Sequence, residues 1–464
     1  MVSALYQLIP DERKRSKAVA TRKIPAGTEF VFHPLVTVVN AEESVCENCL
    51  LFGEGSLRCS RCKQVRYCSA ECQAESWTKG MHKHWCKKQR PDFPSDLKLL
   101  LRLALALKQG GPLAETFDEL IAAQDMLSPI HQVQFEHNAK IIHAILPHWS
   151  EADLITIQAK NLRNSFTVTD GRLFDIGSGV YPLASRHLNH SCYPNCGVSF
   201  RGPQMMVKTL VELKEGDELC INYCDPIVPL KRRRKALEDQ YAFKCTCEAC
   251  TGGGWFETSR QGRKTADEID VNAEEALNAI FRSSISEQIL LVLGTDPDNI
   301  IQARQKVFTT LNIPPIFLNI SVLSLATSRS SSLRTSANWS ESASYGLYVL
   351  AYYLLIYPPA YALVGLHASD LAITMWNAGG WEGMEYIIYA GILRSSDQVL
   401  LLLGLCVPPN IGGRELSAAR QFAPSFCGLT LNDNLYHKHH ISPELVLDSR
   451  SAYLDFTEPI KLPM

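Results

Sequence analysis

The sequence lacks an uninterrupted apolar run of the roughly 18 residues that a membrane-spanning helix needs. Its most apolar stretch, 345–376, is interrupted by Pro358 and Pro359 and also carries Asp370. A charge imbalance is lacking as well, because 46 Lys and Arg stand against 48 Asp and Glu, a formal net charge of −2. We therefore expect no transmembrane segment, no membrane partner and no general attraction of the whole protein to nucleic acid.

The first residues, MVSALYQ, lack the basic start and the apolar run of a secretory signal, so we expect none. The chain nevertheless contains 16 cysteines. In a secreted protein so many cysteines would suggest disulfides. Here we interpret most of them as thiolate ligands of metal ions in a reducing compartment. The 464 residues, 46 % of them hydrophobic, are ordinary for a globular protein of roughly two to four domains.

Four closely spaced ligand pairs lie between residues 46 and 86. They are Cys46 and Cys49, Cys59 and Cys62, Cys68 and Cys72, and His82 and Cys86. Thiolates and imidazoles at these spacings are the ligands of tetrahedral Zn²⁺ sites, so the segment predicts two zinc ions. His84 is the competing imidazole, but it lies too close to Cys86 in sequence. So few large apolar residues cannot form a core, and we expect the metal to hold this segment folded.

Basic residues are frequent in and just after the same segment: Arg58, Arg61, Lys63, Arg66, Lys83, Lys87 and Lys88. They could bind nucleic acid or an acidic partner. A solvated face of a small domain is the interpretation we favour, because no array of base-reading helices is visible. The case for DNA is therefore weak. The basic run 231–235 resembles a nuclear localisation signal, but a solvated helix face is the interpretation we favour for it.

Local patterns predict the surrounding elements. Leucine and alanine fill 97–107 ahead of the breaker Gly110-Gly111-Pro112, which predicts a helix. The turn Pro25-Ala26-Gly27, followed by a β-rich run, predicts a hairpin within 20–32. The serines of 328–332 predict a loop. Amphipathic helices are expected at 266–282, 285–293 and 298–311.

Three further stretches carry the chemistry. They are Asn189-His190-Ser191-Cys192-Tyr193-Pro194-Asn195-Cys196, then Glu218-Leu219-Cys220-Ile221-Asn222-Tyr223, then Cys245-x-Cys247-x2-Cys250. In this order, and behind the zinc-ligand pattern of 46–86, they resemble the SET-and-MYND family of protein lysine methyltransferases.

The resemblance implies a multidomain α+β fold, in which a β-rich SET core is split by a MYND zinc finger and a helical insert. The expected domains are 1–45 (N-terminal SET segment), 46–86 (finger), 87–160 (helical insert), 161–229 (core SET), 230–254 (post-SET zinc segment), 255–407 (C-terminal, repeat-like helical domain) and 408–464 (irregular tail). In the family the finger's ligand pairs interleave. One zinc then takes Cys46, Cys49, Cys68 and Cys72, and the other takes Cys59, Cys62, His82 and Cys86. A third zinc takes Cys192 with Cys245, Cys247 and Cys250. Five cysteines are left over as free thiols: Cys196, Cys220, Cys224, Cys406 and Cys427.

The activity implied is S-adenosylmethionine-dependent methylation of lysines on histones or other proteins. A lysine amine titrates near 10.4, so the site must desolvate it and align it with the methyl donor. By motif position, Tyr223 is the expected catalytic residue, while Tyr181 and Tyr241 line the substrate channel. The expected cofactor contacts are Lys14, Asn164, Asn189, His190, Tyr223 and Phe243.

An alternative stays open: a catalytically impaired SET and MYND protein that serves as an interaction or transcriptional co-regulator module. Arg15 and Lys17 motivate it, because they stand where the family carries a Gly-x-Gly that lets the backbone approach the cofactor. We expect a monomer in the nucleus, the cytoplasm or both, with protein partners bound by the finger and the C-terminal helices.

Overall fold

The computed structural model describes residues 5–11, 15–40, 45–52, 57–251, 272–294, 300–311, 313–358 and 360–379. The chain divides into two compact units, Met1–Val399 and Leu400–Met464, and every described residue belongs to the first. Lys14, Cys406, Cys427 and the predicted tail 408–464 lie outside the described residues.

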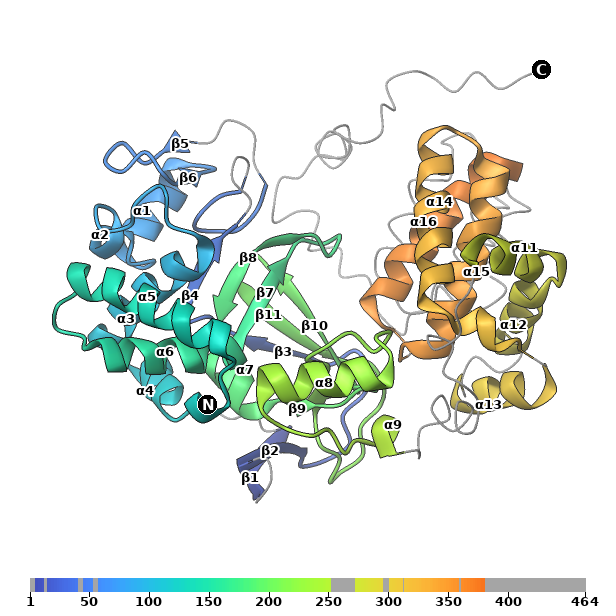
Figure 1. The fold of residues 1–464 in the computed structure, drawn as a ribbon, viewed down its shortest axis with the longest axis horizontal. Coiled ribbons are helices and arrows are strands. Elements are labelled where there is room, and N and C mark those ends of the chain that lie inside the picture. Colours follow the sequence, from blue (N-terminus) through green and yellow to red (C-terminus); the bar gives the residue numbers. More distant parts are fainter. Residues whose placement is uncertain are drawn as a thin grey trace. The chain divides into compact units, whose positions relative to one another are not determined.

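The N-terminal half contains several small sheets (Figure 1). One has the strand order β10-β11-β3, another β4-β8-β7, and β1-β2, β5-β6 and β12-β9 are two-stranded. The strands are β1 (Tyr6–Asp11), β2 (Arg15–Ala20), β3 (Glu29–Phe32), β4 (Val36–Val39), β5 (Leu57–Arg58), β6 (Arg66–Tyr67), β7 (Ser165–Thr169), β8 (Asp175–Val180), β9 (Asn189–His190), β10 (Cys196–Arg201), β11 (Gln204–Thr209) and β12 (Cys220–Ile221).

The hairpin predicted within 20–32 is wrong. The turn is present, and Gly27 takes the positive φ of +84° that such a turn requires. The strands on either side of it, however, pair elsewhere: β2 pairs with β1, and β3 pairs with β11. A turn motif fixes only the local chain direction, whereas the partners are chosen by long-range packing.

The pairing of β9 with β12 positions the site. These two strands run parallel, with Asn189 opposite Cys220 and His190 opposite Ile221. Asn195 fastens the next loop to the same segment, since its side chain donates to the Glu218 carbonyl and accepts from the Cys220 amide, both at 2.8 Å. Two motifs some twenty residues apart in sequence therefore lie side by side.

A run of helices lies between β6 and β7 in the sequence. They are α1 (Ala70–Thr78), α2 (His82–Trp85), α3 (Ser95–Gln109), α4 (Pro112–Asp118), η1 (Gln124–Met126), α5 (Pro129–Ile145) and α6 (Glu151–Asn164). Helix α7 (Pro182–His187) comes later, between β8 and β9. The helix predicted over 97–107 is confirmed as α3. It ends where Gly110 and Gly111 adopt positive φ, and its leucines are buried in the core that joins the finger to the α-helices.

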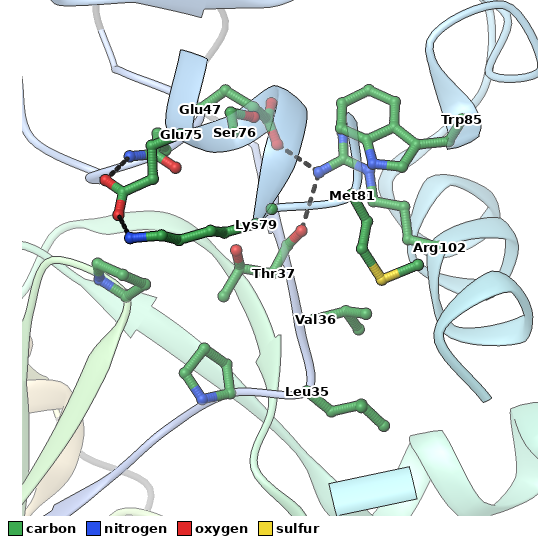
Figure 2. Close-up of a pocket in the computed structure, with 14 residues that line it drawn as sticks. Leu35, Val36, Thr37, Glu47, Glu75, Ser76, Lys79, Met81, Trp85 and Arg102 are labelled. Atoms are coloured by element: carbon green, nitrogen blue, oxygen red, sulfur yellow. Dashed lines mark hydrogen bonds and ion pairs between the residues drawn. The ribbon is translucent and has the colours of Figure 1, made fainter. Parts of the chain in front are cut away.

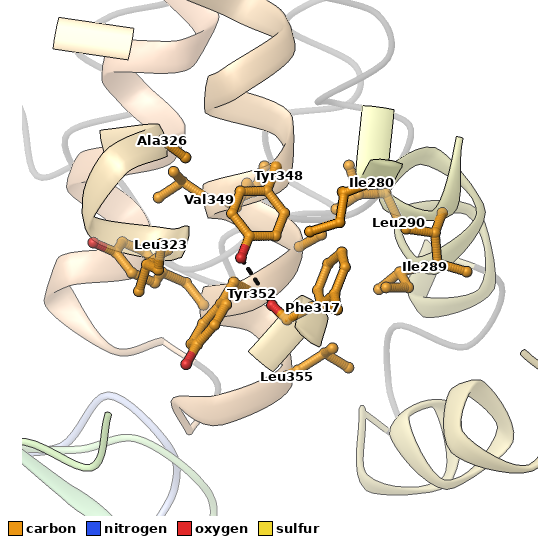
Figure 3. Close-up of a cluster of buried hydrophobic side chains, with 14 of the residues drawn as sticks. Ile280, Ile289, Leu290, Phe317, Leu323, Ala326, Tyr348, Val349, Tyr352 and Leu355 are labelled. Carbon is orange, nitrogen blue, oxygen red and sulfur yellow. Dashed lines mark hydrogen bonds between the residues drawn. The ribbon is translucent and has the colours of Figure 1, made fainter. Parts of the chain in front are cut away.

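After the strands come α8 (Leu230–Tyr241), α9 (Glu248–Thr251), α11 (Ala273–Arg282), α12 (Ile285–Gly294), α13 (Ile300–Thr310), η3 (Pro315–Leu318), α14 (Ile320–Thr335), α15 (Trp339–Ile356) and α16 (Ala362–Gly379). Their core surrounds Phe317, which packs edge-to-face on Tyr348 while the Tyr348 hydroxyl donates to the Phe317 carbonyl at 2.8 Å (Figure 3).

The loop predicted at 328–332 is wrong, because these serines lie within α14. Asn319 caps the start of this helix, and its buried face carries Val322, Leu323 and Ala326. Ser330 bonds to Ser342 of α15. Packing of the two helices therefore outweighs the weak helix propensity of serine.

Polar contacts join the C-terminal helices to the motif segments. Arg304 of α13, 1 % exposed, donates to the Tyr193 hydroxyl at 2.5 Å and to the Leu354 carbonyl at 2.7 Å. Tyr357 donates to Asp225 at 2.7 Å. Among the described residues, no single helix is apolar and long enough to cross a membrane; α11 and α12 meet that test only as a pair bent by 61°.

Candidate active site and metal centres

Two clusters of soft ligands form in the finger (residues 46–86). The structure groups Cys46, Cys49, Cys68 and Cys72 in one cluster, and Cys59, Cys62, His82 and Cys86 in the other. This is the predicted interleaved pairing. His84 belongs to neither cluster. The β5–β6 hairpin and the N-cap of α1, where Ser69 accepts from the Cys72 amide, hold these ligands in position.

A third cluster brings Cys192 together with Cys245, Cys247 and Cys250. Cys192 comes from the loop after β9, whereas the other three surround the start of α9. The Sγ atoms of Cys192 and Cys250 are 3.4 Å apart, and those of Cys192 and Cys245 are 4.0 Å apart. The structure therefore groups Cys192 with the three cysteines that were predicted to share its zinc ion.

The ligand geometry fits zinc. A tetrahedron with Zn–S bonds of about 2.3 Å has S···S edges of about 3.8 Å. The observed separations, from 3.4 Å between Cys68 and Cys72 to 4.0 Å in the third cluster, bracket that value. They are too long for a disulfide, whose sulfurs are about 2.05 Å apart. All described cysteines are free thiols, and the chain can hold three zinc ions.

The protonation of individual ligands suits metal binding. Burial lowers the pKa of His82 to about 4, so its imidazole is neutral at pH 7, and its Nε2 faces the sulfurs of Cys59 and Cys62. The thiols of a cluster share hydrogen bonds, so a bond that lowers the pKa of one partner raises that of the other. The bond from Cys49 lowers the pKa of Cys46 to about 4, while the pKa of Cys49 is raised. In the third cluster the pKa of Cys247 is lowered and that of Cys192 is raised. The thiols whose pKa is lowered give up their protons readily to a metal.

Tyr223 follows β12 and lies at the centre of an aromatic group. Its ring centroid is 4.8 Å from that of Tyr241 and 6.3 Å from that of Phe243. All three rings are half-buried and pack against the third zinc cluster. The Tyr223 hydroxyl donates to the Leu188 carbonyl at 2.6 Å, directly before the Asn-His pair. The zinc segment thus supplies two of the three rings.

Burial keeps these hydroxyls protonated. It raises the pKa of Tyr223 well above its ordinary value and raises the pKa of Tyr241 to about 12. At neutral pH both hydroxyls are therefore hydrogen-bond donors, and neither is a base. What these donors can do is orient a polar group that is brought against the aromatic rings.

Asn189 and His190 lie on the other side of the same pairing. The Asn189 amide nitrogen donates to the Ser16 carbonyl and to Glu218, both at 2.8 Å. With both N–H groups engaged, Asn189 can offer a bound molecule only its acceptor oxygen, which suits the amino groups of S-adenosylmethionine. His190 Nδ1 accepts from the Tyr223 amide at 2.9 Å, and Nε2 faces Cys192 at 3.1 Å.

Other predicted site residues lie apart from Tyr223. Asn164 ends α6, and its side chain donates back to the Lys160 carbonyl at 2.7 Å. Tyr181 is fully buried, pairs with Phe166 and Phe200, and donates to the Pro203 carbonyl at 2.8 Å. It belongs to the core cluster against which Tyr223 packs.

The two residues that replace the family's glycines lie in β2. Lys17 forms an ion pair with Asp11 of β1, at 3.5 Å. Between Arg15 and Lys17, the Ser16 carbonyl accepts from Asn189. The backbone of this strand therefore reaches the Asn-His motif although both flanking residues carry long side chains.

The sequence patterns did not predict the buried arginines, of which Arg233 and Arg102 lie beside the ligand clusters. The run 231–235 was interpreted as a solvated face, and that is wrong for Arg233, which is 2 % exposed and donates from Nε to Cys192 Sγ at 3.0 Å. A signal was available: Leu237 lies one helical turn further on, and both are buried on the same face of α8. Its neighbours Lys231, Arg232 and Lys235 are exposed, as expected.

Arg102 of α3 is the second. Its guanidinium lies 3.7 Å from the Trp85 ring centroid, donates to the Thr37 carbonyl at 2.8 Å and pairs with Glu47, both partners being over 90 % buried. Figure 2 shows Arg102 and Trp85 on one side of a cavity of about 340 Å³, and the ion pair of Lys79 and Glu75 on the other side. Arg102 thus connects the finger, β4 and α3.

In the comparison with protein families, the SET domain model matches residues 16–224. That range contains the finger, both motif strands and Tyr223. It ends at Cys224, ahead of the zinc segment.

Comparison with curated proteins gives several lysine methyltransferases among the similar relatives. Histone-lysine N-methyltransferase SMYD3 of Homo sapiens is 34 % identical over 224 residues, which is 44 % of this chain and 51 % of that protein. N-lysine methyltransferase SMYD2 of Homo sapiens is 30 % identical over 266 residues, 54 % of this chain and 61 % of that protein. The protein of the same name in Gallus gallus is 29 % identical over 286 residues, 58 % of this chain and 65 % of its own length. The chain therefore spans between 51 % and 65 % of these relatives.

Proposed function

We propose that this chain is an S-adenosylmethionine-dependent protein-lysine N-methyltransferase of the SET-domain family that carries a MYND zinc finger. The observation that carries this proposal is the convergence of Tyr223, the Asn189-His190 pair and the third zinc cluster on one pairing of strands. When bound, S-adenosylmethionine supplies the methyl group through its sulfonium. The residues of this chain then have to hold the acceptor amine neutral, dry and in line.

Tyr223 is the residue we assign to orientation of that amine. Its protonated hydroxyl donates a hydrogen bond to the Leu188 carbonyl at 2.6 Å, and this bond fixes the position of the hydroxyl oxygen beside the carbonyl oxygen. An oxygen atom fixed there can accept a hydrogen bond from the lysine nitrogen and leave the nitrogen lone pair free to attack. Orientation of this kind accounts for much of the rate of a bimolecular transfer.

The aromatic rings of Tyr241 and Phe243 serve a second purpose. A lysine ammonium entering between half-buried rings loses hydration, which lowers its pKa and favours the neutral, nucleophilic amine. The ordinary lysine pKa of about 10.4 shows how much of this help is needed at pH 7. We propose Tyr181 as a more distant part of the channel wall, acting through the core on which Tyr223 packs.

The proposed cofactor contacts are Lys14, Asn164, Asn189, His190, Tyr223 and Phe243. Asn189 is the best supported of them, because its free acceptor oxygen matches the amino groups of the cofactor. His190 has both ring nitrogens engaged, so we assign its contact to the backbone.

Transfer of a radiolabelled methyl group to histones and to whole-cell extract tests the proposal. We expect labelled protein with the wild-type chain and at least about a 100-fold lower rate with Tyr223→Phe. Tyr348→Phe removes a buried hydroxyl from the C-terminal core instead and is expected to keep the wild-type rate. Equal rates for wild type and Tyr223→Phe would refute the catalytic assignment.

Calorimetric titration with S-adenosylmethionine separates the enzyme from an impaired interaction module. Binding in the micromolar range is the expected result. Absence of binding at high micromolar cofactor would leave the interaction module as the function, with Arg15 and Lys17 as the reason.

We also propose a monomer in the nucleus, the cytoplasm or both, which takes histone or other protein lysines as substrates and binds protein partners through the finger and the C-terminal helices.

A further inference from the structure

Cys192 is more than one of four zinc ligands, because two side chains from outside the cluster reach its sulfur. Arg233 Nε lies 3.0 Å from Cys192 Sγ, and His190 Nε2 lies 3.1 Å from it. Both side chains are buried, with exposures of 2 % and 6 %. A ligand sulfur with two N–H neighbours in a water-free environment differs from an ordinary structural thiolate.

The direction of the His190 hydrogen bond follows from its other nitrogen. The backbone N–H of Tyr223 can only donate, and it lies 2.9 Å from Nδ1. Nδ1 is therefore the acceptor, and in a neutral imidazole the proton is on Nε2. Nε2–H then donates to the Cys192 sulfur, so His190 bridges the zinc ligand and the backbone of Tyr223.

Arg233 makes the corresponding link on the other side. While its Nε–H points at Cys192, Nη1 donates to the Val228 carbonyl at 2.5 Å and to the Pro226 carbonyl at 3.2 Å. Those carbonyls belong to the linker between Tyr223 and α8. The guanidinium therefore ties the linker that follows Tyr223 to the zinc ligand that precedes it.

The positive charge of Arg233 offsets part of the negative charge of the third zinc site. Four thiolates around Zn²⁺ carry a net charge of −2, and three of the four cysteines, Cys192, Cys245 and Cys250, are at most 4 % exposed. A buried net charge is costly unless it is paired and hydrogen-bonded. One guanidinium at 3.0 Å halves that net charge and supplies a charge-assisted hydrogen bond to the sulfur.

We propose that Arg233 and His190 are the outer hydrogen-bond donors of the third zinc site, and that they hold Cys192 and thereby fix the position of Tyr223. Both are positioning residues. The part that concerns the zinc rests only on the ligand cluster and its neighbours, whereas the consequence for methyl transfer rests on the proposed function.

Zinc release from the full chain to a chromogenic chelator tests the first part. In Arg233→Met, one third of the zinc should leave about 10 to 100 times faster than in the wild type, the range typical for loss of an outer hydrogen bond, while two thirds leave at the wild-type rate. Arg233→Lys keeps the positive charge but cannot donate to the Cys192 sulfur and to the two carbonyls at the same time. One third of its zinc should therefore leave at a rate between those of the wild type and Arg233→Met. Arg232→Met, an exposed neighbour on α8, is the matched control and should release zinc like the wild type.

Two results would overturn the inference. The first is that all zinc leaves Arg233→Met at the wild-type rate. The second is that all three ions leave equally faster in both Arg233 variants, because that indicates a general loss of stability. If Arg233→Met folds poorly, Arg233→Lys is tested instead, by the sulfur-to-metal absorption band of the Co²⁺-loaded protein. We expect this band to be shifted from its position in the wild type, and an unchanged band would contradict the proposal. In the methyl-transfer assay, a lower kcat with unchanged KM for the protein substrate is expected of Arg233→Lys. A wild-type chain that transfers no methyl refutes the proposed function and leaves the zinc measurement to decide on Arg233.

Discussion

Removal of Arg102 should loosen the finger from the rest of the chain, although Arg102 binds no metal. In Arg102→Met the hydrophobic stem is kept and the guanidinium is lost. Glu47, 8 % exposed, then keeps a buried carboxylate without its ion-pair partner. The Gln89 side chain and the Thr37 carbonyl each lose a donor.

The magnitude follows from the burial of the pair. Breaking a buried ion pair by removing one partner costs about 3 to 5 kcal/mol, because the remaining charge has no water to solvate it. Glu47→Gln should cost less, about 1 to 3 kcal/mol, since Arg102 retains its two other acceptors. If the pair acts as a unit, the double variant should cost less than the sum of the single variants by about 2 kcal/mol.

Hydrogen exchange is the appropriate assay, since the chain has several domains and a single unfolding free energy is not defined for it. The amides of Cys86 and Gln89 bond to the carbonyls of His82 and Trp85, within the part of the finger that Arg102 supports. A loss of 3 kcal/mol or more corresponds to exchange at least about 100-fold faster in Arg102→Met. Arg90→Met removes an exposed ion pair with Asp92 and should leave this exchange unchanged. Equal exchange in the Arg90 and Arg102 variants would refute the reasoning.

Two further predictions concern the SET strands. Burial lowers the pKa of His187 to about 4, below the unfolded value near 6.5. The contribution of His187 to stability is therefore complete above pH 6.5 and is lost as the pH falls toward 4, by at most about 3 kcal/mol. His187→Gln keeps an acceptor for Tyr6 and should remove this part of the pH dependence of thermal unfolding; a stability difference between the variant and the wild type that is the same at pH 7 and pH 5 would contradict the prediction. In Gly177→Ala the new Cβ would meet the Val38 carbonyl oxygen at 2.4 Å, so the β4–β8 pairing should lose about 1 to 3 kcal/mol. The Asn40 amide, which bonds to the Ile176 carbonyl beside this pairing, should then exchange its hydrogen faster than in Gly171→Ala, where the Cβ meets nothing within 4 Å; equal exchange would count against the clash.

Local spacing was enough to predict the zinc ligands and α3. Two cysteines with two or three residues between them are close enough to bind the same metal ion. A leucine-rich stretch that ends at two glycines has few alternatives to a helix. The third site needed more, because Cys192 is more than fifty residues from Cys245, and only the resemblance to a family joined them.

Arg233 and Arg102 could not be predicted in the same way. An arginine is buried only where a specific acceptor awaits it, and those acceptors, Cys192 and Glu47, come from distant segments. The same limit explains the hairpin and the serine-rich loop. In both cases the local signal was real, but partners that lie far away in sequence decided the outcome.

The interleaved finger has a consequence for how the chain acquires its metal. Cys49 has a shorter route to Cys59 than to Cys68, so a chain that meets zinc before it folds can first close the shorter loop and bind the ion with the wrong set of ligands. The longer loop is roughly twice as long, and each doubling of a loop costs only about 0.6 kcal/mol of closure entropy. The preference for the wrong set is therefore small, and β5 pairing with β6 is sufficient to reverse it. A finger whose ligand pairs interleave can therefore need to exchange its first ligands before it reaches the final fold.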